Sequence, residues 1–206
     1  MPKIHSLFAS PVISNIVDDL DTEQIQKDKI KFKETKHLGY NPNIAEISRD
    51  IRILENYPTL EKGILKWWED AAYNVFNYRN DFKITTSWVT RTKKGCQSTL
   101  HLHKNSFYSG IFYYGKYSDK SGGIEFMSPL HEYSDFSLES HPPGIHSADN
   151  HQFCPKHNLL LFFPSYLKHR IMYHADNTTR YSLAFNIVPT GLYGVSDAQY
   201  NTEWFI

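Results

Sequence analysis

Hydrophobic residues between positions 60 and 76 recur at spacings of three and four, which is the period of a helix with one buried face. Pro58 precedes this run, and charged residues fill much of the opposite face. We therefore expect a helix over residues 60–76 that lies on a sheet. Residues 22–33 give thinner support for a second helix, and residues 7–17 predict an edge strand.

The pattern changes at about residue 82, beyond which short runs rich in β-branched and aromatic residues alternate with turn residues. These runs predict seven strands, over residues 83–92, 98–103, 107–114, 123–127, 158–163, 169–173 and 180–188. Seven short strands favour a sandwich or a jelly roll. With 206 residues we expect one domain, helical at about 20–80 and a β core at about 82–190.

Residues 128–157 break the regular spacing of the strands, and they predict a long irregular loop. The segment contains four prolines and five histidines, and the spacings of the histidines fit no familiar zinc pattern. Loops of this length in compact domains usually serve as lids or mobile insertions. We interpret this loop as a solvated lid over an active site.

The charge balance excludes some partners. The 22 basic and 22 acidic residues cancel, which argues against nucleic acid and against an anionic membrane surface as partners.

The apolar segment near the N-terminus is too short and too broken for a secretion signal or a membrane span. Cys96 and Cys154 are expected to be free thiols, with one disulfide left open. We expect a cytoplasmic protein, and a homodimer stays open.

The candidate chemistry begins with His101 and His103, which flank Leu102 in a predicted strand. Residues two apart in a strand point to the same face, so two imidazoles would converge there. Such a pair is a metal-binding arrangement, although it also occurs as a satisfied polar pair.

A second group of polar residues follows in the last predicted strands. His169 opens one strand, and Arg180 stands eleven positions later with Ser182 on the same face. A buried arginine beside a hydroxyl is a carboxylate receptor, because the planar guanidinium offers paired donors to two oxygens. The alternative is an arginine in a surface ion pair.

These motifs resemble the 2-oxoglutarate and Fe(II)-dependent oxygenase superfamily, whose fold is a cupin-like double-stranded β-helix. The resemblance narrows to a family common in marine bacteria and phages, through LFASPV at 7–12, HLHKNSFYSGIFYY at 101–114 and LFFPSYLKH at 161–169. In the superfamily a carboxylate usually completes the metal triad, and His103 stands at that place here. The alternative third ligand is a carboxylate from elsewhere, such as Glu125 or Asp135.

The resemblance implies a fold that is mainly β with N-terminal helices, and an Fe(II) site formed by His101, His103 and His169. It also implies that 2-oxoglutarate, the co-substrate, is held through its C5 carboxylate by Arg180, Ser182 and Tyr113. The implied reaction uses O2 to hydroxylate a C–H bond of a small-molecule or peptidyl substrate, in the host cytoplasm if the protein is phage-encoded, and it releases succinate and CO2. The rival functions are a three-histidine dioxygenase that does not use 2-oxoglutarate, and a metal-binding jelly roll without catalysis.

Overall fold

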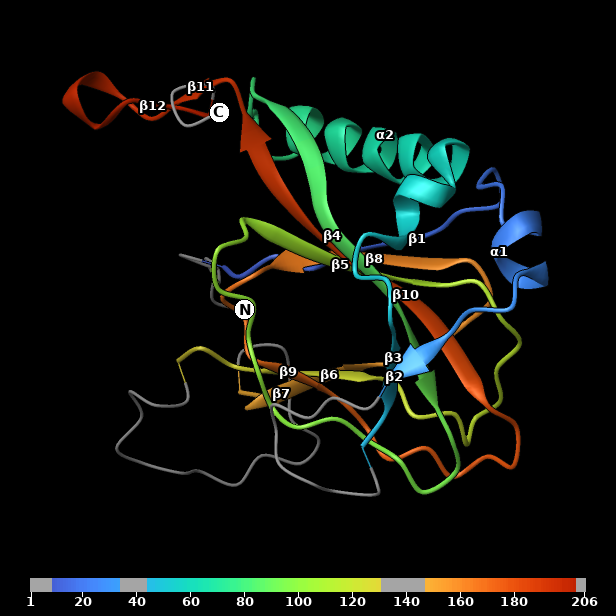
Figure 1. Cartoon of the computed structure of the whole chain (residues 1–206). Helices are drawn as coiled ribbons and strands as arrows, with labels where there is room; N and C mark the ends of the chain where they lie inside the picture. The colour runs from blue at the N-terminus through green and yellow to red at the C-terminus, as the bar shows by residue number, and fades with distance from the viewer. Residues whose placement is uncertain (1–8, 34–43, 131–146, 203–206) are drawn as a thin grey trace.

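The computed structural model describes residues 9–33, 44–130 and 147–202, and its elements form two stacked sheets with a helix on one side (Figure 1). The larger sheet is antiparallel and has seven strands. In spatial order these are β1 (Ile13–Ile16), β8 (Leu159–Pro164), β5 (Tyr108–Tyr113), β10 (Arg180–Thr190), β4 (Asp81–Thr92), β3 (Glu46–Ser48) and β2 (Phe32–Lys33). The smaller sheet has the order β7 (Asn150–Phe153), β6 (Ile124–Met127) and β9 (His169–Ile171). Two antiparallel sheets in this arrangement form the double-stranded β-helix.

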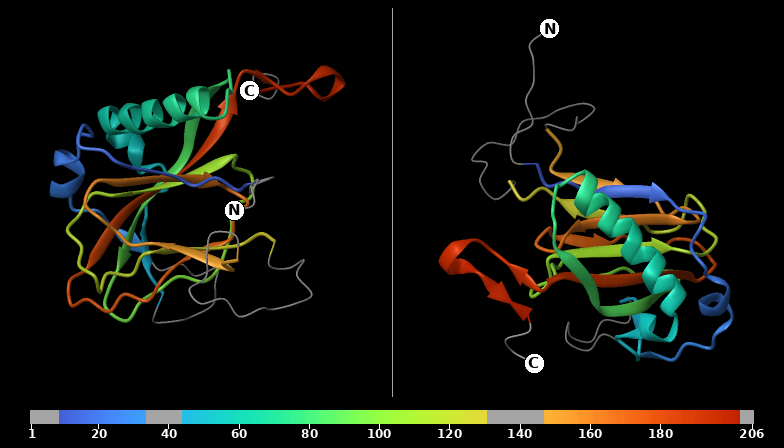
Figure 2. Two further views of the ribbon diagram at one scale, coloured as in Figure 1. Left: turned by 180° about the vertical axis from the view of Figure 1, so that it is seen from behind. Right: turned by 90° about the horizontal axis from the view of Figure 1, so that it is seen from above.

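The helix α2 (Pro58–Asn74) lies across the face of the larger sheet that points away from the smaller one (Figures 1 and 2). Its buried residues are Leu60, Ile64, Trp68 and Ala72, so the three-and-four spacing expected from the sequence is confirmed. Trp68 is fully buried, and its ring lies 4.4 Å from that of Tyr108 on β5. The helix therefore stabilises the larger sheet from outside and leaves the other face of the sheet free to form a site.

Strands β5 and β8 are buried on both faces, which explains why their sequences are apolar without alternation. Tyr108, Phe112, Leu160 and Phe162 pack on the helix side. Ile111, Tyr113, Leu159, Leu161 and Phe163 pack toward the smaller sheet, where they meet Ile124, Phe126, Leu167 and Ile171. The core thus has two layers, one on each face of the larger sheet.

Several predicted boundaries were wrong. Residues 98–103 form no continuous strand, since His101 makes only an isolated bridge to His169. The second helix is shorter than expected: α1 spans Glu23–Lys27, and the chain then enters β2. The predicted loop at 128–157 contains β7, and the helical N-terminal part contains β2 and β3.

The N-terminal edge strand was placed correctly, since β1 pairs with β8 at the edge of the larger sheet. Residues 7 and 8, and residues 131–146 of the predicted loop with Asp135 among them, lie outside the described residues. The 3₁₀ helix η2 (Ile53–Asn56) precedes α2.

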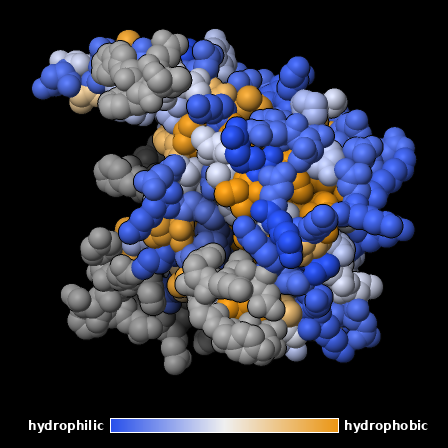
Figure 3. Space-filling view, in the orientation of Figure 1, coloured by the Kyte–Doolittle hydropathy of each residue, from blue (hydrophilic) through white to orange (hydrophobic). Residues whose placement is uncertain are grey.

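A small hairpin at the C-terminal end, formed by β11 (Leu192–Tyr193) and β12 (Tyr200–Asn201), extends away from the two sheets (Figure 2). The 3₁₀ helix η4 (Ser196–Ala198) lies between its strands. Hydrophilic residues cover most of the face drawn in Figure 3, and hydrophobic patches show near its middle. Within the described ranges, no helix combines the length and hydrophobicity needed to cross a membrane.

Candidate active site

The site lies between the two sheets, where three histidines converge. Their ring centroids are 4.5 Å apart for His101 and His169, 5.2 Å for His101 and His103, and 5.1 Å for His103 and His169. One possible ligand atom from each ring lies within 4.8 Å of the other two. The structure therefore brings together all three histidines that the sequence analysis selected as metal ligands.

Backbone pairing explains why these rings meet. His101 and His169 face each other across an antiparallel bridge, with distances from backbone nitrogen to carbonyl oxygen of 2.9 and 2.8 Å. The His103 N–H donates to the carbonyl of Ser165 at 2.9 Å, which holds the extended segment against the turn before β9. Residues at alternate positions of an extended segment share a face, so His103 follows His101 toward His169.

Hydrogen bonds fix the tautomers of two of the rings. The Nδ1 of His101 lies 2.8 Å from the carbonyl of Thr99, and the Nδ1 of His169 lies 2.9 Å from the carbonyl of Leu167. A carbonyl only accepts, so each Nδ1 carries the proton and each Nε2 keeps a free lone pair. This is the arrangement in which histidine binds metal ions, with the second nitrogen held by a backbone oxygen.

The protonation of the cluster also suits a metal. Burial, together with the charge of nearby His101, lowers the pKa of His103 to about 4 and that of His169 to about 3. Both rings are thus neutral at physiological pH, and a metal ion would not have to displace protons from them.

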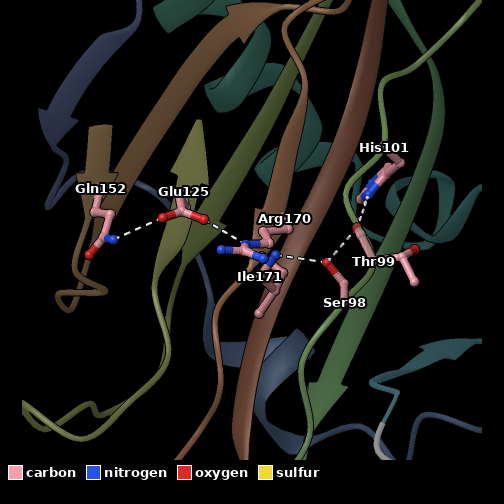
Figure 4. Close-up of polar contacts among 7 residues, drawn as sticks. All are labelled: Ser98, Thr99, His101, Glu125, Gln152, Arg170 and Ile171. Carbon is pink, nitrogen blue, oxygen red and sulfur yellow. Dashed lines mark hydrogen bonds and ion pairs between the residues drawn. The ribbon is translucent and has the colours of Figure 1, made fainter. Parts of the chain in front are cut away.

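Glu125 does not complete the cluster as a third ligand, so this alternative was wrong. Its carboxylate pairs with the Nε of Arg170 at 2.5 Å and accepts a hydrogen bond from Gln152 at 3.0 Å (Figure 4). Its neighbour Phe126 packs against the ring of His169, and successive side chains of a strand point to opposite faces. Glu125 therefore points away from the histidines, and within the described ranges the cluster holds imidazoles alone.

The predicted carboxylate receptor lies on the inner face of the larger sheet. Arg180 and Ser182 are buried on β10, 1% and 0% exposed. Tyr113 on β5 is also fully buried, and the register of β10 on β5, in which Leu183 faces Phe112, places Ser182 opposite Tyr113. The Cζ of Arg180 lies 5.7 Å from the centre of the Tyr113 ring. Tyr113 and His169 both contact the core between the sheets, so the receptor and the histidines face the same interior.

Arg180 carries a buried charge without a carboxylate partner in the part of the chain that the structure describes. Its Nη1 donates to the carbonyl of Gly122 at 2.5 Å and its Nη2 to the hydroxyl of Thr92 at 3.1 Å. Burial lowers the pKa of Arg180 and raises that of Tyr113 to about 12, so the tyrosine hydroxyl stays protonated. A guanidinium in this position is costly unless an anion joins it.

Orphaned polar atoms show what kind of anion fits. Among the described residues, five buried side-chain polar atoms have no hydrogen-bond partner, and three of them are Arg180 Nε, Ser182 Oγ and Tyr113 Oη. All three can donate, and buried polar groups in native structures are normally satisfied. A guanidinium and two hydroxyls that lack acceptors match the oxygens of a carboxylate. The residues present therefore fit the C5 carboxylate of 2-oxoglutarate.

A cavity of about 650 Å³ adjoins the histidine cluster at His103. Its wall includes Tyr78, Phe107 and Tyr166, with Lys104 and Asn105 as polar members. Cavities of this size, mostly apolar with a few polar groups, are typical of small-molecule sites. Trp88, whose ring lies 5.6 Å from that of His103, stands beside the cluster from β4.

The residues that hold Arg180 in place were not among the candidates taken from the sequence. Thr92 faces Arg180 directly in the β4–β10 register, and Gly122 precedes β6. A period of two marks which side chains share a strand face, but it does not show which strands become neighbours. The only available signal was the pair Gly122-Gly123, between a polar turn and the strand β6, which indicates close approach of the backbone.

The double-stranded β-helix and the three-histidine cluster together define a candidate metal-dependent enzyme. Residues 86–186, which contain every candidate ligand named above, match the model of a family described as "Putative 2OG-Fe(II) oxygenase". This part of the chain, from β4 to β10, belongs to the family, the 2-oxoglutarate and Fe(II)-dependent oxygenases. A search of curated proteins found no match.

Solved structures of other proteins have a similar fold. HygX from Streptomyces hygroscopicus, with nickel, 2-oxoglutarate and hygromycin B bound, is 12% identical with a TM-score of 0.59, over 88% of this chain and 84% of that one. A 2OG-Fe(II) oxygenase family oxidoreductase from Burkholderia pseudomallei is 15% identical, with a TM-score of 0.51 over 77% and 72%. A prolyl hydroxylase from Trichoplax adhaerens, in complex with a peptide fragment, is 15% identical, with a TM-score of 0.51 over 80% and 72%.

Proposed function

We propose that this chain hydroxylates a C–H bond, with Fe(II) held by His101, His103 and His169 and 2-oxoglutarate held by Arg180, Ser182 and Tyr113. The observation that carries the proposal is the set of three orphaned donors at a buried guanidinium that has no carboxylate partner among the described residues, in the same interior as three converging imidazoles. Bound iron, with O2 and 2-oxoglutarate, would supply the oxidising chemistry, while the keto acid becomes succinate and CO2.

The residues of the chain position the co-substrate. Arg180 offers Nε–H to one carboxylate oxygen, while its other nitrogens stay on Gly122 and Thr92. The hydroxyls of Ser182 and Tyr113 are free to donate to the second oxygen. Because these donors are buried, water does not compete for the carboxylate, and each charge-assisted bond gains strength from the low local polarity.

The test is anaerobic titration of the Fe(II)-loaded protein with 2-oxoglutarate. We expect a visible metal-to-ligand charge-transfer band, which Arg180→Ala weakens and which His101→Ala and His169→Ala abolish together with metal binding. Arg91→Ala is the matched control, since that arginine lies on the same sheet but pairs with Glu46 at 2.8 Å. Wild-type iron affinity in either histidine variant would rule out this ligand set.

The same titration separates the rival functions. A three-histidine dioxygenase without a keto acid would bind iron but give no band with 2-oxoglutarate. A metal-binding jelly roll without catalysis would form no succinate when O2 is admitted. The presence of a receptor that suits a carboxylate, buried and without its own acceptor, favours the hydroxylase over both.

We also propose that the primary substrate, a small molecule or the side chain of a peptide, binds in the cavity beside His103. Among the structural neighbours, HygX binds hygromycin B and the Trichoplax enzyme is in complex with a peptide fragment, so both classes belong in a substrate screen. Once a substrate is found, Tyr166→Ala should abolish its stimulation of succinate formation. Tyr173→Ala is the control, because Tyr173 is equally exposed, at 58% against 57%, and lies outside the cavity wall. Unchanged stimulation in Tyr166→Ala would place the substrate elsewhere.

A further inference from the structure

A buried histidine outside the metal cluster lies behind the proposed carboxylate receptor. His174, in the turn between β9 and β10, is fully buried. Its Nε2 lies 2.6 Å from the carbonyl of Thr178, so that nitrogen carries the proton. Its Nδ1 is then an acceptor, and it receives the N–H of Gly122 at 3.3 Å. The ring is thus fixed in one tautomer and used at both nitrogens.

The backbone of Gly122 connects this histidine with Arg180. The carbonyl of Gly122 accepts the hydrogen bond from Nη1 of Arg180 at 2.5 Å, while its N–H is held by His174. Gly122 is also packed closely, because a Cβ there would lie 2.2 Å from the carbonyl oxygen of Met172. No residue other than glycine fits this approach, so the Gly122 backbone presents a fixed oxygen to the guanidinium.

The turn that carries His174 is itself held. Asp176 accepts the backbone N–H of Thr178 at 2.8 Å and its hydroxyl at 3.0 Å, which orients the Thr178 carbonyl toward His174. The backbone N–H of His174 donates to the carbonyl of Cys96 at 3.0 Å. The ring is therefore anchored independently of Gly122, and it can transmit that position to the glycine backbone.

From this geometry we infer that His174 is a positioning residue for the co-substrate: through Gly122 it sets the direction in which Arg180 presents its guanidinium to the carboxylate. The inference rests on the proposed function, because it needs Arg180 to bind 2-oxoglutarate. It assigns no contact between His174 and the ligand, and none with the metal cluster.

The test compares two variants that each keep one of the hydrogen bonds. In His174→Asn the side-chain oxygen replaces Nδ1 and keeps the bond from Gly122, while in His174→Gln the side-chain nitrogen replaces Nε2 and keeps the bond to Thr178. The dissociation constants of Ni(II) and of 2-oxoglutarate are measured by calorimetry on each protein. We expect His174→Gln to weaken 2-oxoglutarate about five-fold or more, the effect of one ordinary hydrogen bond, and to leave Ni(II) unchanged. His174→Asn should retain the wild-type affinity for both.

Three reference proteins make the outcome specific. His157→Gln is the matched control, since the Nδ1 of His157 bonds the carbonyl of Gly115 at 2.9 Å, whereas the carbonyl that accepts from Arg180 is that of Gly122. If wild type does not bind 2-oxoglutarate, or if Arg180→Met binds it as wild type does, the proposed function fails. If Arg180→Met loses binding while His174→Gln retains it, the inference about His174 alone is overturned.

A measurement on the unaltered protein covers the case in which the His174 variants do not fold. In the Zn(II)-loaded wild type, exchange of the Gly122 amide proton is followed by NMR with and without 2-oxoglutarate. Because the ligand would tighten the Arg180 contact with the same peptide group, we expect slower exchange at Gly122 and no change at Gly115. Equal rates at Gly122 in the two states would overturn the inference.

Discussion

Replacing Arg180 by methionine separates a binding role from a structural one, because a binding role predicts a loss of affinity with little change in stability and a structural role predicts the reverse. Methionine keeps much of the length of the side chain but removes the buried charge and its donors. The carbonyl of Gly122 and the hydroxyl of Thr92 lose their partners, which are 2.5 and 3.1 Å from the guanidinium. The same substitution removes the buried charge of Arg180, which has no carboxylate partner among the described residues.

The magnitudes nearly cancel for the protein without ligand. Two buried acceptors left without donors cost about 1–3 kcal/mol each. Replacing buried ionic groups by apolar residues of similar volume, as measured for ion pairs, is often neutral or stabilises by about 1–4 kcal/mol. We therefore expect the free energy of unfolding of Arg180→Met to lie within about 2 kcal/mol of wild type. The loss for 2-oxoglutarate is larger, about 2–5 kcal/mol, or roughly 30- to 5,000-fold in Kd.

The assay pairs urea unfolding of the metal-free protein with calorimetric titration of 2-oxoglutarate into the Ni(II)-loaded protein. Arg91→Met is the control, because its guanidinium already has Glu46 as a partner at 2.8 Å. That variant should bind 2-oxoglutarate as wild type does. The reasoning is refuted if Arg180→Met loses more than about 4 kcal/mol of stability while its affinity for 2-oxoglutarate stays unchanged.

Three further predictions follow from the same geometry. Below pH 6.5 the unfolded chain binds protons at His103 and His169, whereas the folded rings do so only near their pKa values of about 4 and about 3. The metal-free protein should therefore be about 4 kcal/mol less stable at pH 5 than at pH 7.5 from these two groups, as measured by urea unfolding, and an unchanged stability would contradict their burial. Glu125→Gln should leave Ni(II) affinity at the wild-type value, since the Glu125 carboxylate pairs with Arg170 and does not face the histidines. A large loss of affinity in a metal titration would show that Glu125 is a metal ligand. Gly110→Ala should destabilise the fold by about 1–3 kcal/mol, because its Cβ would lie 2.3 Å from the Phe185 ring, and thermal unfolding at the wild-type temperature would show that the core yields there.

The elements that could be predicted are those whose burial is visible within one segment. Helix α2 showed its buried stripe through spacing alone, and β5 and β8 showed two buried faces through unbroken apolar runs. Strand β7 could not be found in this way. Its residues Asn150, His151 and Gln152 are exposed, and only pairing with β6 makes the segment a strand. Its backbone conformation is decided by a neighbour, and its own sequence carries no sign of it.

The residues of the candidate site could likewise be predicted only in part. His101 and His103, and likewise Arg180 and Ser182, could be paired from a period of two, even though residues 98–103 turned out to be extended without a continuous ladder. The third-ligand question could not be answered from spacing. Glu125 is excluded because Arg170 and Gln152 hold it on the opposite face of β6, and those contacts join segments far apart in the sequence.

Charge connects the two halves of the site. Burial keeps His103 and His169 neutral, so the ligand set contributes no negative charge to a bound divalent ion, and Arg180 adds one positive charge in the same interior. A ligand triad with one carboxylate would offset one unit of the metal's positive charge, whereas three imidazoles offset none of it. The dianion of 2-oxoglutarate would then meet the metal at its keto-acid end and the guanidinium at its C5 end. It would reduce the excess of positive charge at both places. A buried receptor whose charge is balanced only by its ligand is expensive for the fold alone. A buried Arg180 beside the histidine cluster is therefore understandable as a group that serves binding and adds little to the stability of the fold.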